Sequence, residues 1–313
     1  MDQEQTLYVT GANAAYFPML CVLQGAFQLY MPHLRLLVCD FGLTPGQARF
    51  LAAKKRLLPK PEDLASGRHV YYYKGCMQRY VAHLEFTALV WIDCDCLPVG
   101  PLDQAMHQLR TEHGLPARHL LASIDPVAAD LGTFLRQHGA TVAPFARLMA
   151  EAPIPLDRPY LNGGLFRLAD RATLVHYDAI MQRLTDHFLF DQNAFNHAVH
   201  AADLPTVLLD PDLWNISGSR LDGLTCEEQP NSLPTFLYGG QRVWNLHISD
   251  DKAQNHVQLV ALDLPVDGGY LRGLLREPKL AVLRQLIHDI LQFYLFHQPE
   301  NRRLLTACGA LET

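Results

Sequence analysis

The sequence lacks the features that mark several classes of protein. It has no apolar stretch approaching the roughly 20 residues of a membrane-spanning helix. Lys and Arg form no stripe with interleaved aromatic residues, and the net charge is −6. Both facts argue against nucleic acid as the main partner, because phosphate neutralisation needs clustered cations. Only 19% of the residues are charged and 49% are hydrophobic, a composition that indicates a globular protein rather than a disordered one.

Cysteine is present but never at C-x-x-C spacing. The seven cysteines are scattered, which argues against zinc ribbons and dithiol redox motifs. Free thiols in a reducing cytosol fit this pattern best. The first ten residues, MDQEQTLYVT, are acidic and lack the basic and apolar regions of a signal peptide. We therefore expect a cytoplasmic protein, either free or peripheral at a membrane. The one N-x-S sequon, at Asn215, is a triplet that often arises by chance.

Strand-like and helix-like segments alternate over about the first 100 residues. TLYVTGAN, HLRLLVCDFG, HVYYY and ALVWID have the composition of strands, and helical patterns separate them. Thr44 is a candidate N-cap, with Pro45 in the first turn and Gln47 in the position of a capping box. The alternation predicts an α/β fold with a mostly parallel sheet flanked by helices. Ligands of such sheets gather at the carboxyl ends of the strands.

The second half of the chain is less regular. Residues 126–160 are rich in Pro, Ala and Leu and show no clear element. YLNGGLFRL is typical of a turn into a strand, DQNAFNHAVHAA of a helix, and TVLLDPDLWN and RVWNLHI of strands. The tail 278–298 is a long amphipathic helix, whose apolar face we expect to pack on the core.

Two acids, Asp93 and Asp95, follow the apolar run VWI at the end of a predicted strand. In an extended chain they would point to the same side, and two such carboxylates suit Mg²⁺ or Mn²⁺ bridging a diphosphate. A polar turn after a strand is an equally simple interpretation. A second pair, Asp210 and Asp212, flanks Pro211 and suits a turn better than a strand end.

A further interpretation is phosphoryl chemistry. WIDCDCL resembles the motif of haloacid-dehalogenase-like phosphatases, in which Asp93 would be the nucleophile and Asp95 a general acid. That family usually carries the motif on its first strand, whereas two good strands precede it here. The phosphatase is therefore the weaker alternative.

Several patterned segments follow one another along the chain. They are TGANAAY, LLVCDFGLTPGQARFL, VYYYKGCMQRYVAHLEFTALVWIDCDCLPVGPLD, PYLNGGLFRL, FLFDQNAFN, LWN and NLHIS. In this order they resemble nucleotide-sugar glycosyltransferases of the GT-A fold, especially glycosyltransferase family 8 and its relatives. The resemblance implies a Rossmann-like GT-A domain over 6–260, followed by a C-terminal helical extension over 261–313 that packs on it. It also implies a metal-dependent, retaining transfer of a hexose from a nucleotide diphosphate sugar, with a UDP-sugar as the expected donor.

The resemblance assigns the metal and the nucleotide to particular residues. Asp93 and Asp95 would bind Mn²⁺ or Mg²⁺ and, through it, the diphosphate, with His247 as the third protein ligand. Lys74 or Arg79 would contact phosphate or the donor sugar. The residues expected to line the nucleotide are Thr10, Gly11, Ala12, Asn13 and Tyr16, with Cys94 between the two acids.

The resemblance also assigns the sugar site. Asn162, Gly163 and Gly164 would shape the sugar pocket. Asp191 would bind sugar hydroxyls and Gln192 would lie close to the reacting carbon, which makes these two the candidate catalytic residues. The acceptor would be a carbohydrate, a lipid-linked sugar or a protein. A non-catalytic relative that only binds sugar nucleotides is a further alternative.

Each of these residues also has an ordinary structural explanation. Asp191 would be a good N-cap, and His247 an ordinary surface or core histidine. Residues 162–164 suit a simple turn. His197 and His200 are expected on a helix surface, because no acid completes a recognisable metal set around them.

The chain departs from the family pattern after His247. Family 8 enzymes usually continue as H-x-x-G-x-x-K, but Asp250 stands at the glycine position and Lys252 comes one residue early. The pattern therefore predicts no lysine in the usual register for the diphosphate.

Overall fold

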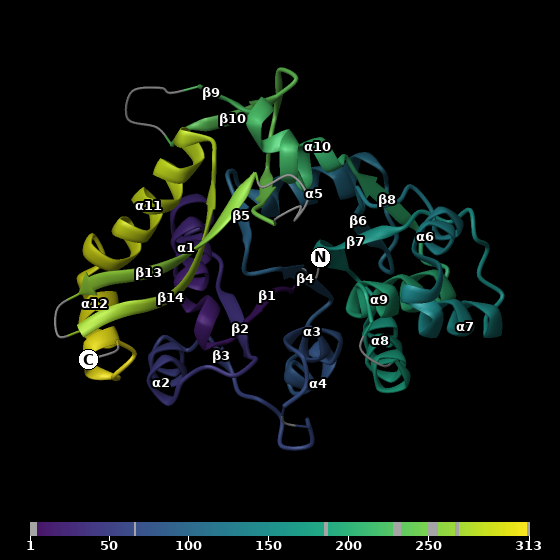
Figure 1. Ribbon diagram of the computed structural model, residues 1–313, viewed down its shortest axis with the longest axis horizontal. Coiled ribbons are helices and arrows are strands. Elements are labelled where there is room, and N and C mark those ends of the chain that lie inside the picture. The colour runs from purple at the N-terminus through teal and green to yellow at the C-terminus, as the bar shows by residue number, and fades with distance from the viewer. Residues whose placement is uncertain are drawn as a thin grey trace. The chain divides into compact units, whose positions relative to one another are not determined.

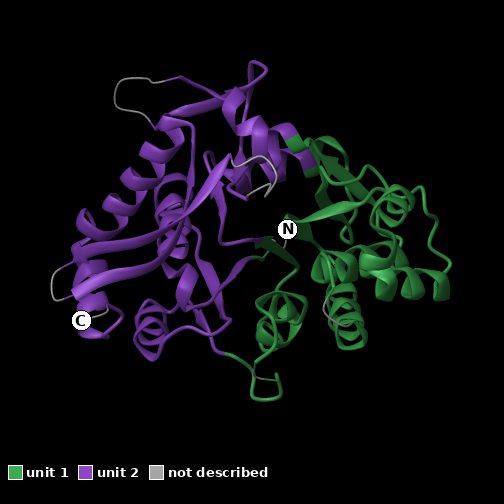
Figure 2. Ribbon diagram, viewed as in Figure 1, with its two compact units in different colours: residues 1–7, 60–91, 110–211 green, residues 8–59, 92–109, 212–313 purple. Residues whose placement is uncertain are grey.

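The computed structural model describes residues 5–65, 67–184, 187–227, 233–249, 256–266 and 269–311 (Figure 1). Asp250 and Lys252, which mark the departure from the family pattern, lie outside the described residues. The chain divides into two compact units, each built from separated stretches of sequence (Figure 2). Unit 1 is drawn from residues 1–7, 60–91 and 110–211, and unit 2 from residues 8–59, 92–109 and 212–313.

Unit 2 contains the first strands and the C-terminal helices. Its elements, including three that begin or end in unit 1, are β1 (Thr6–Ala12), η1 (Ala14–Tyr16), α1 (Phe17–Tyr30), β2 (Leu36–Asp40), α2 (Pro45–Ala53), β3 (Leu57–Leu58), β5 (Cys96–Pro98), α5 (Leu102–Glu112), α10 (Pro211–Trp214), η3 (Gly218–Gly223), β9 (Thr225–Glu227), β10 (Thr235–Tyr238), β11 (Gln241–Arg242), β12 (Asn245–His247), β13 (Val257–Val266), β14 (Gly269–Pro278), α11 (Ala281–Phe296) and α12 (Pro299–Ala307).

Unit 1 contains the elements from the middle of the chain. They are α3 (Val70–Gly75), α4 (Met77–Tyr80), β4 (Ala88–Ile92), β6 (Leu120–Ile124), α6 (Leu131–His138), η2 (Gly139–Val142), α7 (Ala143–Glu151), β7 (Leu161–Leu168), α8 (Arg171–Arg183), α9 (Phe190–Ala201) and β8 (Thr206–Leu209).

A seven-stranded sheet in the described part of the chain has the strand order β3-β2-β1-β4-β7-β6-β8. The pairings of β1 with β2, β2 with β3 and β6 with β8 are parallel, and that of β6 with β7 is antiparallel. Helices lie against the strands of both units, for example α2 on β3 and α9 on β7. The mostly parallel α/β fold expected from the alternating sequence pattern is confirmed.

Local signals placed α2 correctly. The Thr44 hydroxyl accepts a hydrogen bond from Gln47 N at 3.2 Å, and Thr44 N donates to Gln47 Oε1 at 3.0 Å, which completes the predicted capping box. HVYYY was expected as a strand, but Val70–Gly75 form the helix α3. The His69 ring accepts a hydrogen bond from Tyr71 N, and burial of Tyr72 and Tyr73 outweighs the strand propensity of tyrosine.

The unassigned middle segment is largely helical. Residues 131–151 form α6, η2 and α7, which surround a core that includes Phe134, Phe145 and Tyr160. The Phe134 and Tyr160 rings stack with their centroids 4.0 Å apart. All residues of this aromatic cluster belong to unit 1.

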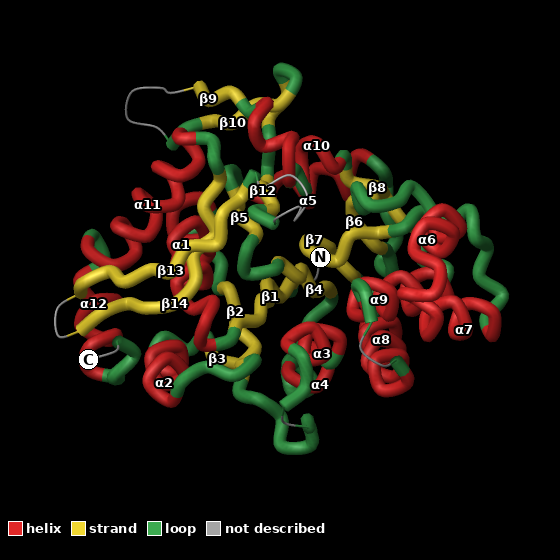
Figure 3. The backbone as a smooth tube through the Cα atoms, viewed as in Figure 1, coloured by secondary structure: helices red, strands yellow, loops and turns green. Residues whose placement is uncertain are grey.

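The C-terminal segment begins with a β-hairpin. β13 and β14 pair antiparallel along their full lengths, and the boundary expected between residues 260 and 261 falls inside β13. The division into a transferase domain and a helical extension stays a prediction. The tail helix α11 packs on α1 and β14 (Figure 3). The apolar face predicted for it is buried, and its residues are Leu283, Leu286, Ile287, Ile290 and Tyr294. Among the described helices, none combines the length and the apolar character that spanning a bilayer requires.

Candidate functional site

The two acids of the D-x-D segment lie in a turn of unit 2, directly before β5. Cys96 N donates a hydrogen bond to Asp93 O at 2.9 Å, the pattern of a β-turn. The expectation that Asp93 and Asp95 share one side of an extended chain is therefore wrong. The alternative prediction of a polar turn is correct for the backbone of residues 93–96, and the side chains of both acids are half-buried.

The turn presents Asp95 to a strand that comes 150 residues later in the sequence. β12 pairs antiparallel with β5, and this register places His247 opposite Cys96. Ile248 N donates to Asp95 O at 2.8 Å, which ties the backbone of the turn to the end of β12. As a result, His247 Nε2 lies 3.5 Å from Asp95 Oδ1, with only 11% and 15% of the two side chains exposed.

The orientation of the His247 ring is fixed by Asn215. His247 Nδ1 lies 3.0 Å from Asn215 Oδ1, and the asparagine is 2% exposed. Because an amide oxygen only accepts, Nδ1 carries the proton in this contact and donates it. Nε2 is then the ring nitrogen that faces the Asp95 carboxylate. An outer hydrogen bond of this kind orients the histidine ligand of a metal.

The ligand atoms near this point fit a divalent cation. Among the described residues, Asp95, Cys96 and His247 offer ligand atoms that all lie within 4.8 Å of one another. A carboxylate suits Mg²⁺ or Mn²⁺, whereas imidazole and thiolate ligands favour zinc and other later transition metals. The predicted set and this group share Asp95 and His247. Among the described residues, this group does not include Asp93, so a role of Asp93 as a metal ligand stays a prediction.

Cys94, between the two acids, belongs to the packing rather than to the ligand set. Its side chain lies against the apolar core of unit 2. Burial, followed by the negative charges of Asp95 and Asp93, raises the pKa of the Cys94 thiol well above its usual value. A neutral thiol is a poor nucleophile and a poor metal ligand.

Arg276 is a residue of this cluster that the sequence did not point to. It comes from β14, and its Nε lies 3.3 Å from Asp95 Oδ2. Its guanidinium carbon lies 5.8 Å from the centre of the Tyr16 ring. The predicted nucleotide residue Tyr16 and the predicted metal ligand Asp95 are thus joined by one cation. The strand β14 lies beyond the motifs that resemble the family, so the sequence did not predict a contact between Arg276 and Asp95.

The predicted nucleotide loop follows β1. Tyr16 N donates to Asn13 Oδ1 at 3.1 Å, so Asn13 caps the short helix η1 and fixes the backbone of Tyr16. Packing explains the glycine at position 11, because a Cβ there would lie 2.2 Å from the Phe41 ring. Thr10 and Ala12 are buried. In this loop, Asn13 and Tyr16 are therefore the partly exposed side chains of the predicted set.

Unit 1 contains a separate, buried polar cluster. Asp125 accepts hydrogen bonds from Asn162 Nδ2 at 2.6 Å and from Gln192 Nε2 at 3.0 Å. Gln192 Oε1 accepts from Gly163 N at 3.1 Å, and Asn162 Oδ1 accepts from Gly164 N at 2.7 Å. Residues 162–164 lie inside β7, so the simple-turn interpretation of this segment is wrong. The predicted residues Asn162 and Gln192 are held in fixed orientations by the same carboxylate.

Asp125 was missed by the sequence reasoning. It follows β6 directly and is 6% exposed. Asp93 and Asp95 were recognised as candidates because they follow a predicted strand. Asp125 also follows a strand, but this strand was not predicted from the sequence. The DQNAFN pattern is in part structural, because Asn196 binds the backbone of Leu161, the first residue of β7.

The candidate residue Asp191 forms a buried ion pair. Lys74 Nζ lies 3.4 Å from Asp191 Oδ2, and each side chain is 6% exposed. Asp191 stands in the first turn of α9, whose N-cap is Leu189 in the left-handed conformation with a φ of 51°. The N-cap interpretation of Asp191 is therefore wrong. A left-handed leucine is uncommon and costs free energy, which singles out this helix start.

The two candidate cations of the predicted donor site have different surroundings. Lys74 is buried beside Asp191, and its Nζ lies 5.9 Å from the centre of the Trp91 ring. Arg79 instead binds Asp178 at 2.7 Å and the exposed Asp63 at 2.9 Å. Its hydrogen bond to Asp178 raises the pKa of Arg79 above its usual value. Of the two, Lys74 is the one in contact with another predicted site residue.

The helix histidines lie inside unit 1. His197 was expected on the helix surface but is 5% exposed, and its ring centre lies 5.5 Å from that of His176. Burial, followed by the nearby His176, lowers the pKa of His197 to about 4. His200 Nε2 contacts Pro159 O at 2.8 Å. The surface interpretation is wrong for His197, which is buried, whereas His200 near the end of α9 is partly exposed.

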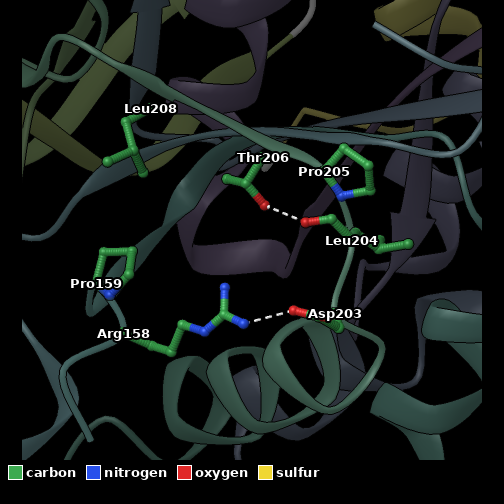
Figure 4. Close-up of a pocket in the computed structure, with 7 residues that line it drawn as sticks. All are labelled: Arg158, Pro159, Asp203, Leu204, Pro205, Thr206 and Leu208. Atoms are coloured by element: carbon green, nitrogen blue, oxygen red, sulfur yellow. Dashed lines mark hydrogen bonds and ion pairs between the residues drawn. The ribbon is translucent and has the colours of Figure 1, made fainter. Parts of the chain in front are cut away.

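A surface pocket of about 450 Å³ in unit 1 lies away from the predicted residues (Figure 4). Arg158 points toward Asp203 across it, with Nη2 2.5 Å from Oδ1, and both side chains are exposed. The remaining lining residues are Pro159, Leu204, Pro205, Thr206 and Leu208. An exposed ion pair contributes little binding energy to a ligand.

Among known proteins, the matches to this chain are solved structures. No family model and no curated protein matches the chain. The chain is similar to the bifunctional glycosyltransferase WbbM, at 10% identity and a TM-score of 0.47 over 69% of this chain and 40% of WbbM. It is also similar to the galactosyltransferase LgtC in complex with donor and acceptor sugar analogues, at 14% identity and a TM-score of 0.47 over 80% of this chain and 91% of LgtC.

A third similar structure is the glycosyltransferase GlyE of Streptococcus pneumoniae TIGR4, at 13% identity and a TM-score of 0.39 over 67% of this chain and 46% of GlyE. The chain spans less than half the length of WbbM and of GlyE, and most of the length of LgtC.

Proposed function

We propose that this protein is a metal-dependent glycosyltransferase, which moves a hexose from a UDP-sugar to a carbohydrate, lipid-linked sugar or protein acceptor. One observation carries the proposal. His247 Nε2 faces Asp95 Oδ1 at 3.5 Å while Asn215 holds Nδ1 from behind. A carboxylate oxygen and an imidazole nitrogen that face one another in a largely buried place are atoms of the kind that bind a divalent cation.

In unit 2, Asp95 and His247 would hold Mn²⁺ or Mg²⁺, with Asp93 as a further ligand. When bound, the ion neutralises charge that develops on the diphosphate leaving group. Tyr16 and Asn13 would contact the base and ribose, together with the backbone of residues 10–12. The setting that we propose is the cytoplasm, either free or peripheral at a membrane.

In unit 1, the buried cluster would bind the sugar. Asp125 and Asn162 supply carboxylate and amide oxygens of the kind that accept from sugar hydroxyls. Asp191 and Gln192 are the residues that we propose to act nearest to the transferred carbon. Gln192 is held at both ends of its amide, which favours a positioning role for it over a nucleophilic one. We propose retention of configuration, as the resemblance implies.

The test is a panel of UDP-sugars with detection of released UDP. We expect release from one donor, dependent on Mn²⁺, and abolished by Asp95→Ala and by His247→Ala. Asp263→Asn is a matched control, because Asp263 is an exposed carboxylate paired with Arg272 on the hairpin. Absence of both UDP binding and donor-dependent release in the wild type would refute the proposal.

The alternatives predict different results. A phosphatase would trap phosphate on Asp93, with Asp95 as the proton donor. Asp95 is ion-paired with Arg276, and a carboxylate in an ion pair is a poor proton donor, so this alternative is not favoured. A non-catalytic relative would bind UDP but release none from any donor in the presence of any acceptor.

A further inference from the structure

Arg276 is a positively charged side chain that lies beside Asp95 and Tyr16 in unit 2. Its Nε lies 3.3 Å from Asp95 Oδ2, and its Nη1 donates to Ile248 O at 3.4 Å. Its guanidinium also lies near the Tyr16 ring. Both polar contacts are longer than the roughly 2.7–2.9 Å of a strong charge-assisted hydrogen bond. Arg272, four residues earlier on the same strand, reaches Asp263 at 2.9 Å and shows such a bond.

The backbone of β14 places Arg276 firmly. Gly273, with a φ of 149°, lies so close to η1 that a Cβ would be 2.6 Å from Ala15 O. Arg276 N also approaches Met19 Sδ at 3.3 Å. The strand is therefore packed directly against the segment that carries Tyr16. The side chain is only 17% exposed, so its stem is buried and its charged end is held near Asp95.

Charge compensation for Asp95 is the ordinary explanation of this arginine. A lysine, or an arginine in a tight two-point contact, would serve that purpose as well or better. The contact of Arg276 Nε is with Asp95 Oδ2, whereas the other carboxylate oxygen, Oδ1, faces His247. A cation between Asp95 Oδ1 and His247 Nε2 would leave this contact in place. The metal and the guanidinium can then act on the same anion.

We infer that Arg276 binds the diphosphate of a nucleoside diphosphate, alongside the cation held by Asp95 and His247. This inference rests on the proposed function. The planar guanidinium matches the geometry of phosphate oxygens, and its contact with Asp95 keeps it next to the metal ligand. Arg276 is thus a binding residue for the departing group, supplied by the C-terminal hairpin.

The experiment measures ligand binding rather than turnover. UDP and inorganic pyrophosphate are titrated calorimetrically against the wild type, Arg276→Gln and Arg276→Lys, each with Mn²⁺ and with chelator. Mn²⁺ alone is titrated by electron paramagnetic resonance. Arg272→Gln is the matched control, because it removes an arginine of the same strand whose carboxylate partner is Asp263 on β13 rather than Asp95.

We expect Arg276→Gln to weaken UDP and pyrophosphate binding about 10- to 100-fold, the loss of one hydrogen bond to a charged group. Arg276→Lys should keep part of the affinity, and Arg272→Gln all of it. Mn²⁺ alone should bind Arg276→Gln and the wild type within about threefold of each other. Thermal unfolding of each variant shows whether it is folded, and Arg276→Lys serves as the test if Arg276→Gln is not.

Two results would overturn the inference while leaving the proposed function in place. One is unchanged UDP and pyrophosphate affinity in folded Arg276 variants. The other is a loss of UDP affinity that occurs only with Mn²⁺ and matches a loss of Mn²⁺ affinity, since Arg276 would then merely orient Asp95. If the wild type binds neither UDP nor pyrophosphate, both the proposed function and the inference fail.

Discussion

Replacing Asn215 tests the metal site without touching a metal ligand. The His247 Nδ1 hydrogen bond to Asn215 Oδ1 is 3.0 Å long and buried, and Asn215→Ala removes it. Loss of such an outer partner typically weakens metal binding about 10- to 100-fold, or about 1.4–2.8 kcal/mol. The stability of the metal-free protein should also fall, by about 1–3 kcal/mol, because Nδ1 loses its partner.

Asn215→Asp separates the two possible directions of this hydrogen bond. A carboxylate only accepts, so it can replace the amide oxygen if Nδ1 donates. We expect Asn215→Asp to bind Mn²⁺ at least as tightly as the wild type, and Asn215→Ala to bind it more weakly. Ser217→Ala, two residues along the same segment, is the control that should leave Mn²⁺ affinity unchanged.

The assay is a Mn²⁺ titration followed by electron paramagnetic resonance, with chemical unfolding measured in parallel. Equal Mn²⁺ affinity of Asn215→Ala and the wild type would refute the role of Asn215. Equal weakening in Asn215→Ala and Asn215→Asp would show that Nδ1 accepts rather than donates, and Nε2 would then carry the proton. The argument for a cation between Asp95 and His247 would fail with it.

Two further predictions concern unit 1. Lys74→Met should destabilise the protein by about 3–5 kcal/mol in urea unfolding, because it leaves the buried Asp191 carboxylate unpaired, and Lys74→Met/Asp191→Leu should recover most of the loss. A loss of less than about 1 kcal/mol in Lys74→Met would contradict the buried pair. His197, with its pKa lowered to about 4, is neutral in the folded state, so the unfolded chain takes up the proton first as the pH falls below about 6.5. The free energy of unfolding should therefore fall by about 2–3 kcal/mol between pH 6.5 and 4, and His197→Asn should show a flatter pH dependence over this range.

The fold was predictable where the signals are local. The alternation of strand and helix patterns and the capping box at Thr44 depend on neighbours within a few residues. The failures come from tertiary packing. HVYYY became a helix because Tyr72 and Tyr73 are buried, and the hairpin at 257–278 was hidden in a segment expected to be helical.

The candidate site was predictable in part for the same reason. Asp93 and Asp95 stand at the end of an apolar strand, a position that can be recognised in the sequence alone. The resemblance supplied His247, but the partners Asn215 and Arg276 depend on the register of β12 and on the path of β14. Contacts between residues so far apart in the sequence cannot be predicted from the spacing of residues. Asn215 belongs to the LWN motif and to the N-x-S sequon, but neither pattern predicts a buried contact between Asn215 and His247.

The charges around the D-x-D turn give a reason why these partners belong together. Among the described side chains there, Asp93 and Asp95 contribute two negative charges, Arg276 contributes one positive charge, and His247 donating from Nδ1 can remain neutral. With His247 neutral, the formal charges of these side chains therefore sum to one negative charge. A divalent cation would reverse the sign to one positive charge, which disfavours the cluster alone but suits an anionic diphosphate. The metal and the diphosphate should thus bind with positive coupling, and the guanidinium from the C-terminal hairpin contributes to that coupling.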